Sequence, residues 1–199
     1  MNKLISTHNS ATGNPGYGWF SKLATPFAKC QSKSLTEQYE AGCRYFDIRV
    51  VKTDDRGLVT AHGSWRGITL YDALEELRDA CSIDDGFAYI DVTWEENVSK
   101  WSDSKKKYAV DIIKHYVEHI NFDADVPDCK PIRLVSIGGK HPFGTVFWKS
   151  EKYTPTMVQK IKALYWFTWR LLIPTPWFWR KVYGQAKFNN EYYTQVDFL

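Results

Sequence analysis

The chain has 199 residues, of which 44% are apolar and 25% are charged, the balance of an ordinary globular protein. This composition excludes a disordered chain and predicts a single domain spanning residues 1–199. A formal net charge of +3 is too small to predict nucleic-acid binding, and the 16% of aromatic residues predicts deep pockets, a broad aromatic core or a membrane-facing surface.

No targeting segment or membrane span is visible in the sequence. Only Leu4 and Ile5 are strongly apolar before the chain becomes polar at Ser6, whereas a secretory signal needs a longer apolar run. The longest apolar stretch, 163–173, contains Arg170 and falls short of the about 20 residues that span a bilayer. The four cysteines form no CxxC pair and predict free thiols in a reducing compartment. We therefore expect a monomer without a transmembrane segment, in the cytoplasm or in a compartment that the sequence does not identify.

Short apolar runs alternate along the chain with longer amphipathic stretches. The runs that predict strands are 3–8, 43–51, 58–62, 87–94, 132–137, 145–148 and 193–198. The stretches with helical spacing are 35–41, 69–80, 102–120 and 156–172, with Thr69 as a plausible cap. This alternation predicts an α/β fold with mostly parallel strands, and the number of strands fits either an open sheet or a compact (β/α)₈-like barrel.

Three of the predicted strands carry polar groups suited to catalysis. The first strand ends at His8, the second contains Asp47 and Arg49, and the third ends at His62. Asp47 and Arg49 stand two residues apart, so they share one face of their strand. Because the C-terminal ends of barrel strands build the active site, we expect these side chains to converge.

Two histidines with an arginine–carboxylate pair are the groups that phosphodiester cleavage requires. One imidazole removes a proton from the nucleophile, the other protonates the leaving oxygen, and a guanidinium neutralises the pentavalent phosphorane. Taken alone, a strand-end histidine is more often a structural hydrogen-bonding group, and an Asp-x-Arg pair is usually a salt bridge. Their combination in this order favours the catalytic interpretation.

The segments that carry these groups resemble the catalytic X-type domain of the phosphatidylinositol-specific phospholipase C superfamily. The matching segments are Ser6-Thr7-His8-Asn9-Ser10, Gln38-Tyr39-Glu40-Ala41-Gly42-Cys43-Arg44-Tyr45-Phe46-Asp47-Ile48-Arg49 and Ala61-His62-Gly63. They follow the family's order of a first-strand histidine, a Q…GxRxxDIR second strand and an HG third strand. The match covers about the first 80 residues, and the ending 194–198 resembles the family's late strand.

The resemblance implies an irregular TIM-type (β/α) barrel that cleaves an inositol phospholipid. The inositol 2-hydroxyl would attack the phosphorus, giving a cyclic inositol phosphate and diacylglycerol. The family's roles would make His8 the general base and His62 the general acid. Arg49 would bind the phosphate, Asp47 would orient Arg49 or His62, and Asp197 would hold His8.

The charges in these segments favour a site without metal or other cofactor. Asn9 is the residue of the calcium-dependent eukaryotic members of the family, whereas the bacterial members carry aspartate. A later calcium-ligand position holds Arg49, and the fourth-strand acid falls on Thr93; a hard cation prefers several oxygens and no guanidinium beside them. Asp91 and Glu95 share parity with Thr93, which leaves open that one of them faces the cleft. We expect instead an interior hydrogen-bonded Asp91 and a solvated Glu95.

Three further residues are expected to contact the substrate. They are Asn9, Thr93 and Lys140, the last within a Gly-Gly-Lys-His segment that lacks the spacing of a phosphate-binding P-loop.

The region from 152 to 190 combines seven basic residues with no acidic one and is rich in aromatic residues. Its tryptophans predict peripheral contact with a phospholipid surface through Trp166, Trp169, Trp177 and Trp179. The alternative is that these aromatic side chains close the core of a small barrel.

The leading functional prediction is therefore a phospholipase C-like phosphodiesterase of the phosphorus–oxygen lyase type. A phosphodiesterase acting on another lipid or on a glycerophosphodiester is an alternative, although the related glycerophosphodiesterases carry a metal-binding Glu-x-Asp where this chain has Asp-Ile-Arg. A second alternative is a catalytically silent binder of lipid head groups. Asn9 in place of aspartate favours it, whereas the two strand-end histidines speak against it.

Overall fold

The computed structural model describes residues 4–28, 30–96, 98, 101–122, 130–138, 187–189 and 193–196. The predicted strand at 145–148 and the predicted helix at 156–172 lie outside the described residues.

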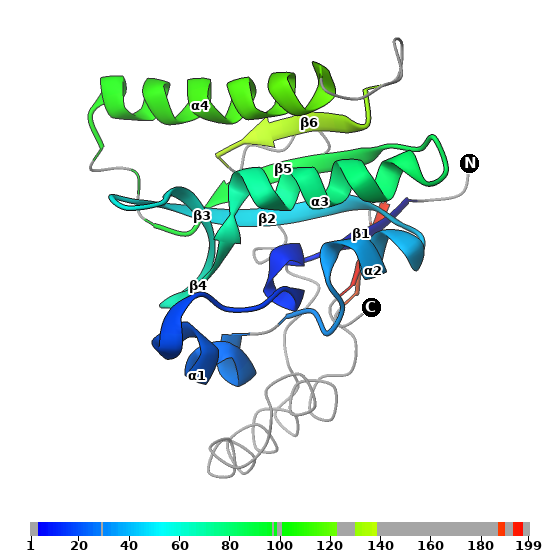
Figure 1. Cartoon of the computed structure of the whole chain (residues 1–199), viewed down its shortest axis with the longest axis horizontal. Coiled ribbons are helices and arrows are strands. Elements are labelled where there is room, and N and C mark those ends of the chain that lie inside the picture. The colour runs from blue at the N-terminus through cyan, green and yellow to red at the C-terminus, as the bar shows by residue number, and fades with distance from the viewer. Residues whose placement is uncertain are drawn as a thin grey trace.

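The centre of the fold is an eight-stranded sheet with a parallel core (Figure 1). Five strands run parallel, in the spatial order β8 (Tyr193–Val196), β1 (Leu4–Thr7), β2 (Cys43–Thr53), β5 (Ala88–Trp94) and β6 (Ile132–Ile137). The antiparallel strands are β3 (Gly57–His62) and β4 (Trp65–Thr69), which extend from the end of β2, and β7 (Lys187–Asn189), which pairs with β8. The predicted α/β fold with mostly parallel strands is confirmed.

The first and third strands lie end to end along the same side of β2. β1 pairs with the first half of β2 and ends with Thr7 opposite Phe46. β3 pairs with the second half of β2, from Gly57 opposite Thr53 to Thr60 opposite Val50. Because the pairing is antiparallel, β3 runs back towards the end of β1. β5 occupies the other side of β2 throughout. This arrangement brings the residues that follow β1 close to the end of β3.

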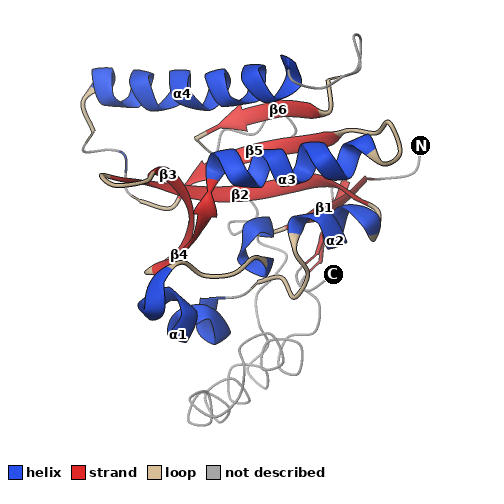
Figure 2. Ribbon diagram, in the orientation of Figure 1, coloured by secondary structure: helices blue, strands red, loops and turns tan. Residues whose placement is uncertain are grey.

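Both faces of β2 are buried over most of its length, although polar side chains interrupt its apolar residues. Phe46, Ile48 and Val50 face the hydrophobic core that the helices cover, whereas Asp47 and Arg49 face the opposite side. Three helices contribute to the core or pack beside it (Figure 2), namely α2 (Leu35–Glu40), α3 (Leu70–Ser82) and α4 (Asp103–Phe122). One face of the sheet is thus structural, and the other is free to carry polar chemistry.

The boundaries of the helices follow from local capping. Thr69 caps α3 as predicted, since its side chain accepts from the Asp72 N–H while the Asp72 side chain accepts from the Thr69 N–H. Ser34 forms the same reciprocal box with Glu37 at the start of α2. Each box satisfies backbone donors that the first helical turn leaves unpaired.

Two elements near the predicted site were not expected from the sequence. They are the helix α1 (Gly18–Ala28) and the strand β4, which follows a turn at Gly63 with φ 57°. A short 3₁₀ helix, η1 (Ser10–Gly13), also follows β1. The periodicity of α1 is obscured because Trp19, Phe20 and Leu23 are apolar but exposed.

The sheet does not close into a barrel within the described residues. Among these strands, β6 pairs only with β5, β7 only with β8 and β4 only with β3, so the branched sheet has three open edges. The structure therefore supports a mixed α/β fold, while closure into an irregular TIM-type barrel stays a prediction. No helix in the described ranges has the length and apolar character needed to cross a membrane.

Candidate active site

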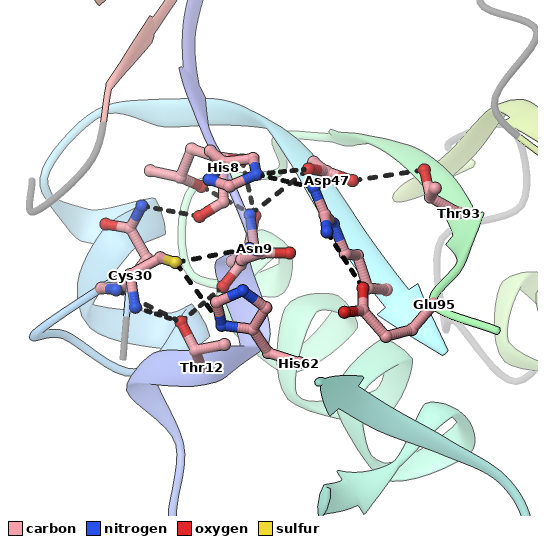
Figure 3. Close-up of polar contacts among 12 residues, drawn as sticks. His8, Asn9, Thr12, Cys30, Asp47, His62, Thr93 and Glu95 are labelled. Atoms are coloured by element: carbon pink, nitrogen blue, oxygen red, sulfur yellow. Dashed lines mark hydrogen bonds and ion pairs between the residues drawn. The ribbon is translucent and has the colours of Figure 1, made fainter. Parts of the chain in front are cut away.

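The end of β1 is fixed by a tight turn at Asn9. Asn9 adopts the left-handed conformation with φ 46° and ψ 48°, which asparagine tolerates better than most residues. The turn directs the Asn9 backbone N–H to Asp47 Oδ2, at 3.3 Å. The Gln31 side chain donates to the His8 carbonyl oxygen at 2.9 Å. These bonds hold the buried His8 next to β2 (Figure 3).

Arg49 joins His8 to the neighbouring strand. Its Nη2 lies 3.0 Å from His8 Nε2, and its Nη1 donates to Glu95 Oε2 at 2.9 Å. Burial acts to lower the pKa of Arg49, but the charges of Asp47 and Glu95 outweigh it and raise the pKa. The guanidinium is therefore a fixed cation at the level where β1 ends.

The contact with Arg49 also defines the protonation of His8. A guanidinium can only donate, so His8 Nε2 must accept in this bond and carries no proton. In the neutral ring the proton then resides on Nδ1. Asp47 Oδ2 lies 3.7 Å from Nε2, close enough to stabilise an imidazolium once the ring gains a proton. His8 thus has the arrangement of a base.

His62 has the complementary arrangement. Its Nδ1 lies 2.6 Å from the Ala28 carbonyl oxygen at the end of α1, and because a carbonyl can only accept, Nδ1 carries a proton. Burial acts to lower the pKa of His62, but Cys30, the Ala28 carbonyl and Glu95 outweigh it and raise the pKa. A histidine that retains its second proton to higher pH, on Nε2, is suited to act as an acid.

Glu95 connects the two halves of the site and was not predicted to do so. Its Oε2 accepts from Arg49, and its Oε1 accepts from the Gly63 backbone N–H at 2.7 Å. Its side chain is only 15% exposed. The expectation of a solvated loop acid is therefore wrong, because β5 pairs with β2 in a register that directs Glu95 to the cleft side. The shared parity with Thr93 was the sequence signal.

Two residues of β5, Thr93 and Asp91, lie next to Asp47 on the neighbouring strand. The Thr93 hydroxyl is 3.4 Å from Asp47 Oδ1, and Asp91 lies opposite Asp47 in the strand register. Ser136 donates to Asp91, as expected for an interior hydrogen-bonded carboxyl. Burial and the nearby Asp47 raise the pKa of Asp91 to about 7, while the Ser136 bond acts to lower it.

Cys30 is a further member of the site that sequence reasoning missed. Its Sγ accepts from Asn9 Nδ2 at 3.3 Å and lies 3.8 Å from His62 Nδ1 (Figure 3). Cys30 follows α1 in a loop, with no motif around it, so only the tertiary structure reveals its position. The predicted free thiols are confirmed for the described cysteines Cys30, Cys43 and Cys81.

Several predicted site residues lie outside the described residues. β8 ends at Val196, which pairs with Thr7, and Asp197 follows it. Lys140 and the tryptophans of the predicted membrane contact are likewise not described, namely Trp166, Trp169, Trp177 and Trp179. The roles of these residues stay predictions.

The described residues form no group of three or more His, Cys, Asp or Glu side chains that could hold a metal ion. Arg49 places a cation between His8 and Glu95, which is unfavourable for a second cation at that point. Whether the reaction uses a metal stays a prediction to be tested with a chelator.

Of the comparisons with known proteins, the one with solved structures bears on the fold. No protein-family model and no curated protein matches the sequence. The phosphatidylinositol-specific phospholipase C from Listeria monocytogenes matches with a TM-score of 0.53 and 21% identity, over 83% of this chain and 66% of that chain. Two forms of the Staphylococcus aureus enzyme, a mutant and one containing pentafluoro-Phe, match with TM-scores of 0.50 and 0.51 and 18% identity, over 71% of this chain and 48% of theirs.

The chain thus spans about half to two thirds of the length of these structures. The resemblance that the sequence motifs indicated is confirmed at the level of the fold, which is similar to that of the bacterial phosphatidylinositol-specific phospholipases C.

Proposed function

We propose that this protein is a phosphodiesterase that cleaves an inositol phospholipid by the lyase chemistry of phospholipase C. One observation carries the proposal: His8, Arg49 and His62 come together from three strands with complementary protonation. The Arg49 guanidinium holds His8 Nε2 unprotonated, and the pKa of His62 is raised. A base, an acid and a phosphate-binding cation are the groups that the reaction needs.

The catalytic cycle begins with the phosphate group. A phosphate oxygen is a stronger acceptor for Arg49 Nη2 than a neutral imidazole, so substrate binding releases His8 Nε2. His8 then takes the proton of the inositol 2-hydroxyl, whose oxygen attacks the phosphorus. His62 Nε2 protonates the departing diacylglycerol oxygen, and Arg49 stabilises the phosphorane. The product is a cyclic inositol phosphate.

The neighbouring residues have supporting roles in this proposal. Asp47, at 3.7 Å from His8 Nε2, stabilises the imidazolium that forms. Asp197 holds His8 through Nδ1, and Lys140 contacts the head group. Asn9 and Thr93 line the binding site for the phosphate and the inositol ring. No metal or other cofactor takes part. The remaining strands complete an irregular TIM-type barrel, consistent with the parallel order of the five central strands.

The surface of α1 supports a substrate embedded in a lipid layer. Trp19 and Leu23 are 75% and 67% exposed, and Phe20 lies beside them. The same helix ends at Ala28, whose carbonyl oxygen contacts His62, so the helix that carries this apolar surface also reaches the site. Exposed apolar side chains of this size mark an interaction surface, and tryptophan is favoured at the membrane interface. The predicted contact through Trp166, Trp169, Trp177 and Trp179 would extend this surface.

The test follows the phosphorus NMR signals of phosphatidylinositol vesicles during incubation with the protein, with and without a chelator. We expect the signal of a five-membered cyclic phosphate to appear, equally in the presence of chelator. A non-cyclic inositol phosphate as first product, or no turnover, would contradict the proposal. Cleavage of glycerophosphodiesters alone would favour the alternative substrate, and loss of activity with chelator would overturn the metal-free mechanism.

A further inference from the structure

Cys30 lies between two parts of the site that the proposed reaction uses. Its sulfur contacts Asn9 Nδ2 at 3.3 Å and lies 3.8 Å from His62 Nδ1. The Thr12 hydroxyl accepts from the Cys30 backbone N–H at 2.9 Å, so η1 fixes the residue in place. Cys30 is partly exposed, whereas Cys43 and Cys81 are buried. A small reagent in the cleft therefore meets this thiol before the other two.

Beside the sulfur, one hydrogen-bond acceptor is unsatisfied. Asn9 is 1% exposed, and its Oδ1 has no hydrogen-bond partner among the residues that the structure describes. The Nδ2 of the same amide already donates to Cys30. A buried polar atom without a partner is costly, so this carbonyl favours any group on the sulfur that supplies a donor.

We propose that Cys30 is a modification site, a thiol that hydroperoxides oxidise to a sulfenic acid and thereby switch the enzyme off. This proposal rests on the proposed function, because the oxidation of Cys30 would regulate that activity. The S–O–H group adds the donor that Asn9 Oδ1 lacks, which favours the oxidised form in this environment. A thiol itself donates only weakly, and the Cys30 thiol donates to the Ala28 carbonyl oxygen, at 3.8 Å from the sulfur.

The oxidation is a two-electron transfer from sulfur to the peroxide. The Cys30 thiolate attacks the hydroxyl oxygen of the hydroperoxide, so that a sulfur–oxygen bond forms as the oxygen–oxygen bond breaks. The sulfur loses two electrons, and the departing alkoxide or hydroxide gains them and takes a proton from His62 or water. An added thiol reverses the step by forming a mixed disulfide and water, and a second thiol molecule releases Cys30.

The ionisation of Cys30 agrees with this role. Burial acts to raise its pKa, but the hydrogen bonds and charges of His62 and His8 outweigh it and lower the pKa to about 6. Burial instead raises the pKa of Cys43 to about 11. At neutral pH Cys30 is therefore mostly thiolate, the reactive form, and Cys43 is almost entirely protonated.

Oxidation disturbs the site through both neighbours of the sulfur. The added oxygen occupies space between Asn9 and His62, and the sulfur loses the negative charge that helps to raise the pKa of His62. His62 then gives up its second proton at lower pH and becomes a poorer acid at neutral pH. The backbone N–H of Asn9 also donates to Asp47 of β2. A displacement of Asn9 therefore weakens this hydrogen bond.

The test compares the full chain carrying Cys129→Ser with the same chain carrying Cys30→Ser as well. The Cys129→Ser background leaves the three described cysteines as the only thiols. Each protein is treated with hydrogen peroxide and dimedone, and peptide mass spectrometry gives the rate of sulfenic acid trapping at each cysteine. Activity on phosphatidylinositol vesicles is followed in parallel without dimedone, relative to the untreated rate of the same variant.

We expect Cys30 to be trapped at least about tenfold faster than Cys43 or Cys81, in keeping with its thiolate character. Activity should fall at the rate of Cys30 oxidation and return with dithiothreitol, while the Cys30→Ser protein keeps its own untreated rate. Equal trapping at the three cysteines, or equally fast inactivation of Cys30→Ser, would overturn the proposal.

Failure of the proposed function is separable from failure of this proposal. If the untreated protein cleaves no inositol phosphodiester, the proposed function fails, and trapping rates still decide whether Cys30 is the reactive thiol. The imidazole NMR signal of His62, assigned with His62→Gln, then reports on the site without turnover. A His62 pKa that falls on oxidation supports the coupling, and an unchanged one contradicts it.

Discussion

At the scale of single residues, Glu95 links Arg49 to the turn after His62, the two residues that we propose as phosphate-binding cation and acid. It accepts from Arg49 through one oxygen and from the Gly63 N–H through the other, next to His62. The carboxylate thus orients the guanidinium and the turn after β3, and its charge contributes to the raised pKa of His62. Glu95 acts as a positioning residue rather than as a group that touches the reacting atoms.

Replacing Glu95 by glutamine removes the charge and one of the two acceptor oxygens, so that the bond from Arg49 is lost when the bond from Gly63 is kept. Glu95→Gln retains an acceptor for the Gly63 N–H, but removes a negative charge that raises the pKa of His62. We therefore expect the alkaline limb of the kcat/KM profile, where His62 loses its proton, to move to lower pH. The matched control is Glu96→Gln, which alters a neighbouring carboxylate bonded to the Lys52 N–H outside the site. An unshifted limb in Glu95→Gln, or an equal shift in both variants, would contradict the assignment.

At the scale of elements, the alignment of β2, β5 and β6 places Asp47, Asp91 and Ser136 side by side. The pKa of Asp91 rises to about 7 because the carboxyl is buried and lies near Asp47. The folded state therefore holds this proton more tightly than the unfolded chain does. Its contribution to stability is fully present below about pH 4 and is lost as the pH rises through about 7.

Asp91→Asn should remove this pH dependence while keeping an acceptor for Ser136. We expect the free energy of unfolding of the variant minus that of the wild type to be larger at about pH 8 than at about pH 4, because only the wild type loses stability as Asp91 ionises. Urea unfolding followed by circular dichroism at the two pH values measures the difference. An identical difference at both values would mean that Asp91 does not hold a proton in the folded protein.

The helix α1 carries the exposed apolar surface that we propose to contact the lipid substrate. Trp19 and Leu23 point away from the core, so the double variant Trp19→Ala, Leu23→Ala should weaken binding to phosphatidylinositol vesicles without lowering the melting temperature. Co-sedimentation measures binding, and hydrolysis of a water-soluble inositol phosphodiester shows whether the site is intact. Tyr108→Ala on α4 is the matched control, because Tyr108 is exposed on a helix that does not contact His62. A lower melting temperature with unchanged vesicle affinity would exclude α1 as the lipid-binding surface.

At the scale of the whole molecule, the predictable parts are those with strong local patterns. The buried strands and capped helices were predicted within a few residues, since their periodicity and capping groups are local. His8, Asp47, Arg49 and His62 could be chosen as candidate site residues because they lie on or follow recognisable strands, and their roles stay predictions. Glu95 depends on the register between β2 and β5, and Cys30 on the packing of a loop against η1, neither of which a local pattern encodes.

The fold is similar to that of the bacterial phospholipases C, and within it the strands β1, β2 and β3 position the two histidines. β1 and β3 meet end to end along β2, so His8 and His62 approach one another from opposite directions of the chain. The central claim is that His8 acts as base and His62 as acid across this junction. The claim concerns roles, so the most direct test must distinguish the two histidines.

That test compares His8→Ala and His62→Ala on two inositol phosphodiesters, one with an alkyl and one with an aryl leaving group. We predict that each variant loses about 10²–10⁴ in kcat/KM on the alkyl substrate. An aryl oxygen leaves without protonation, so the aryl substrate should restore much of the rate of His62→Ala and little of that of His8→Ala. Near-wild-type activity of either variant on the alkyl substrate, or equal rescue of both by the aryl group, would contradict the account.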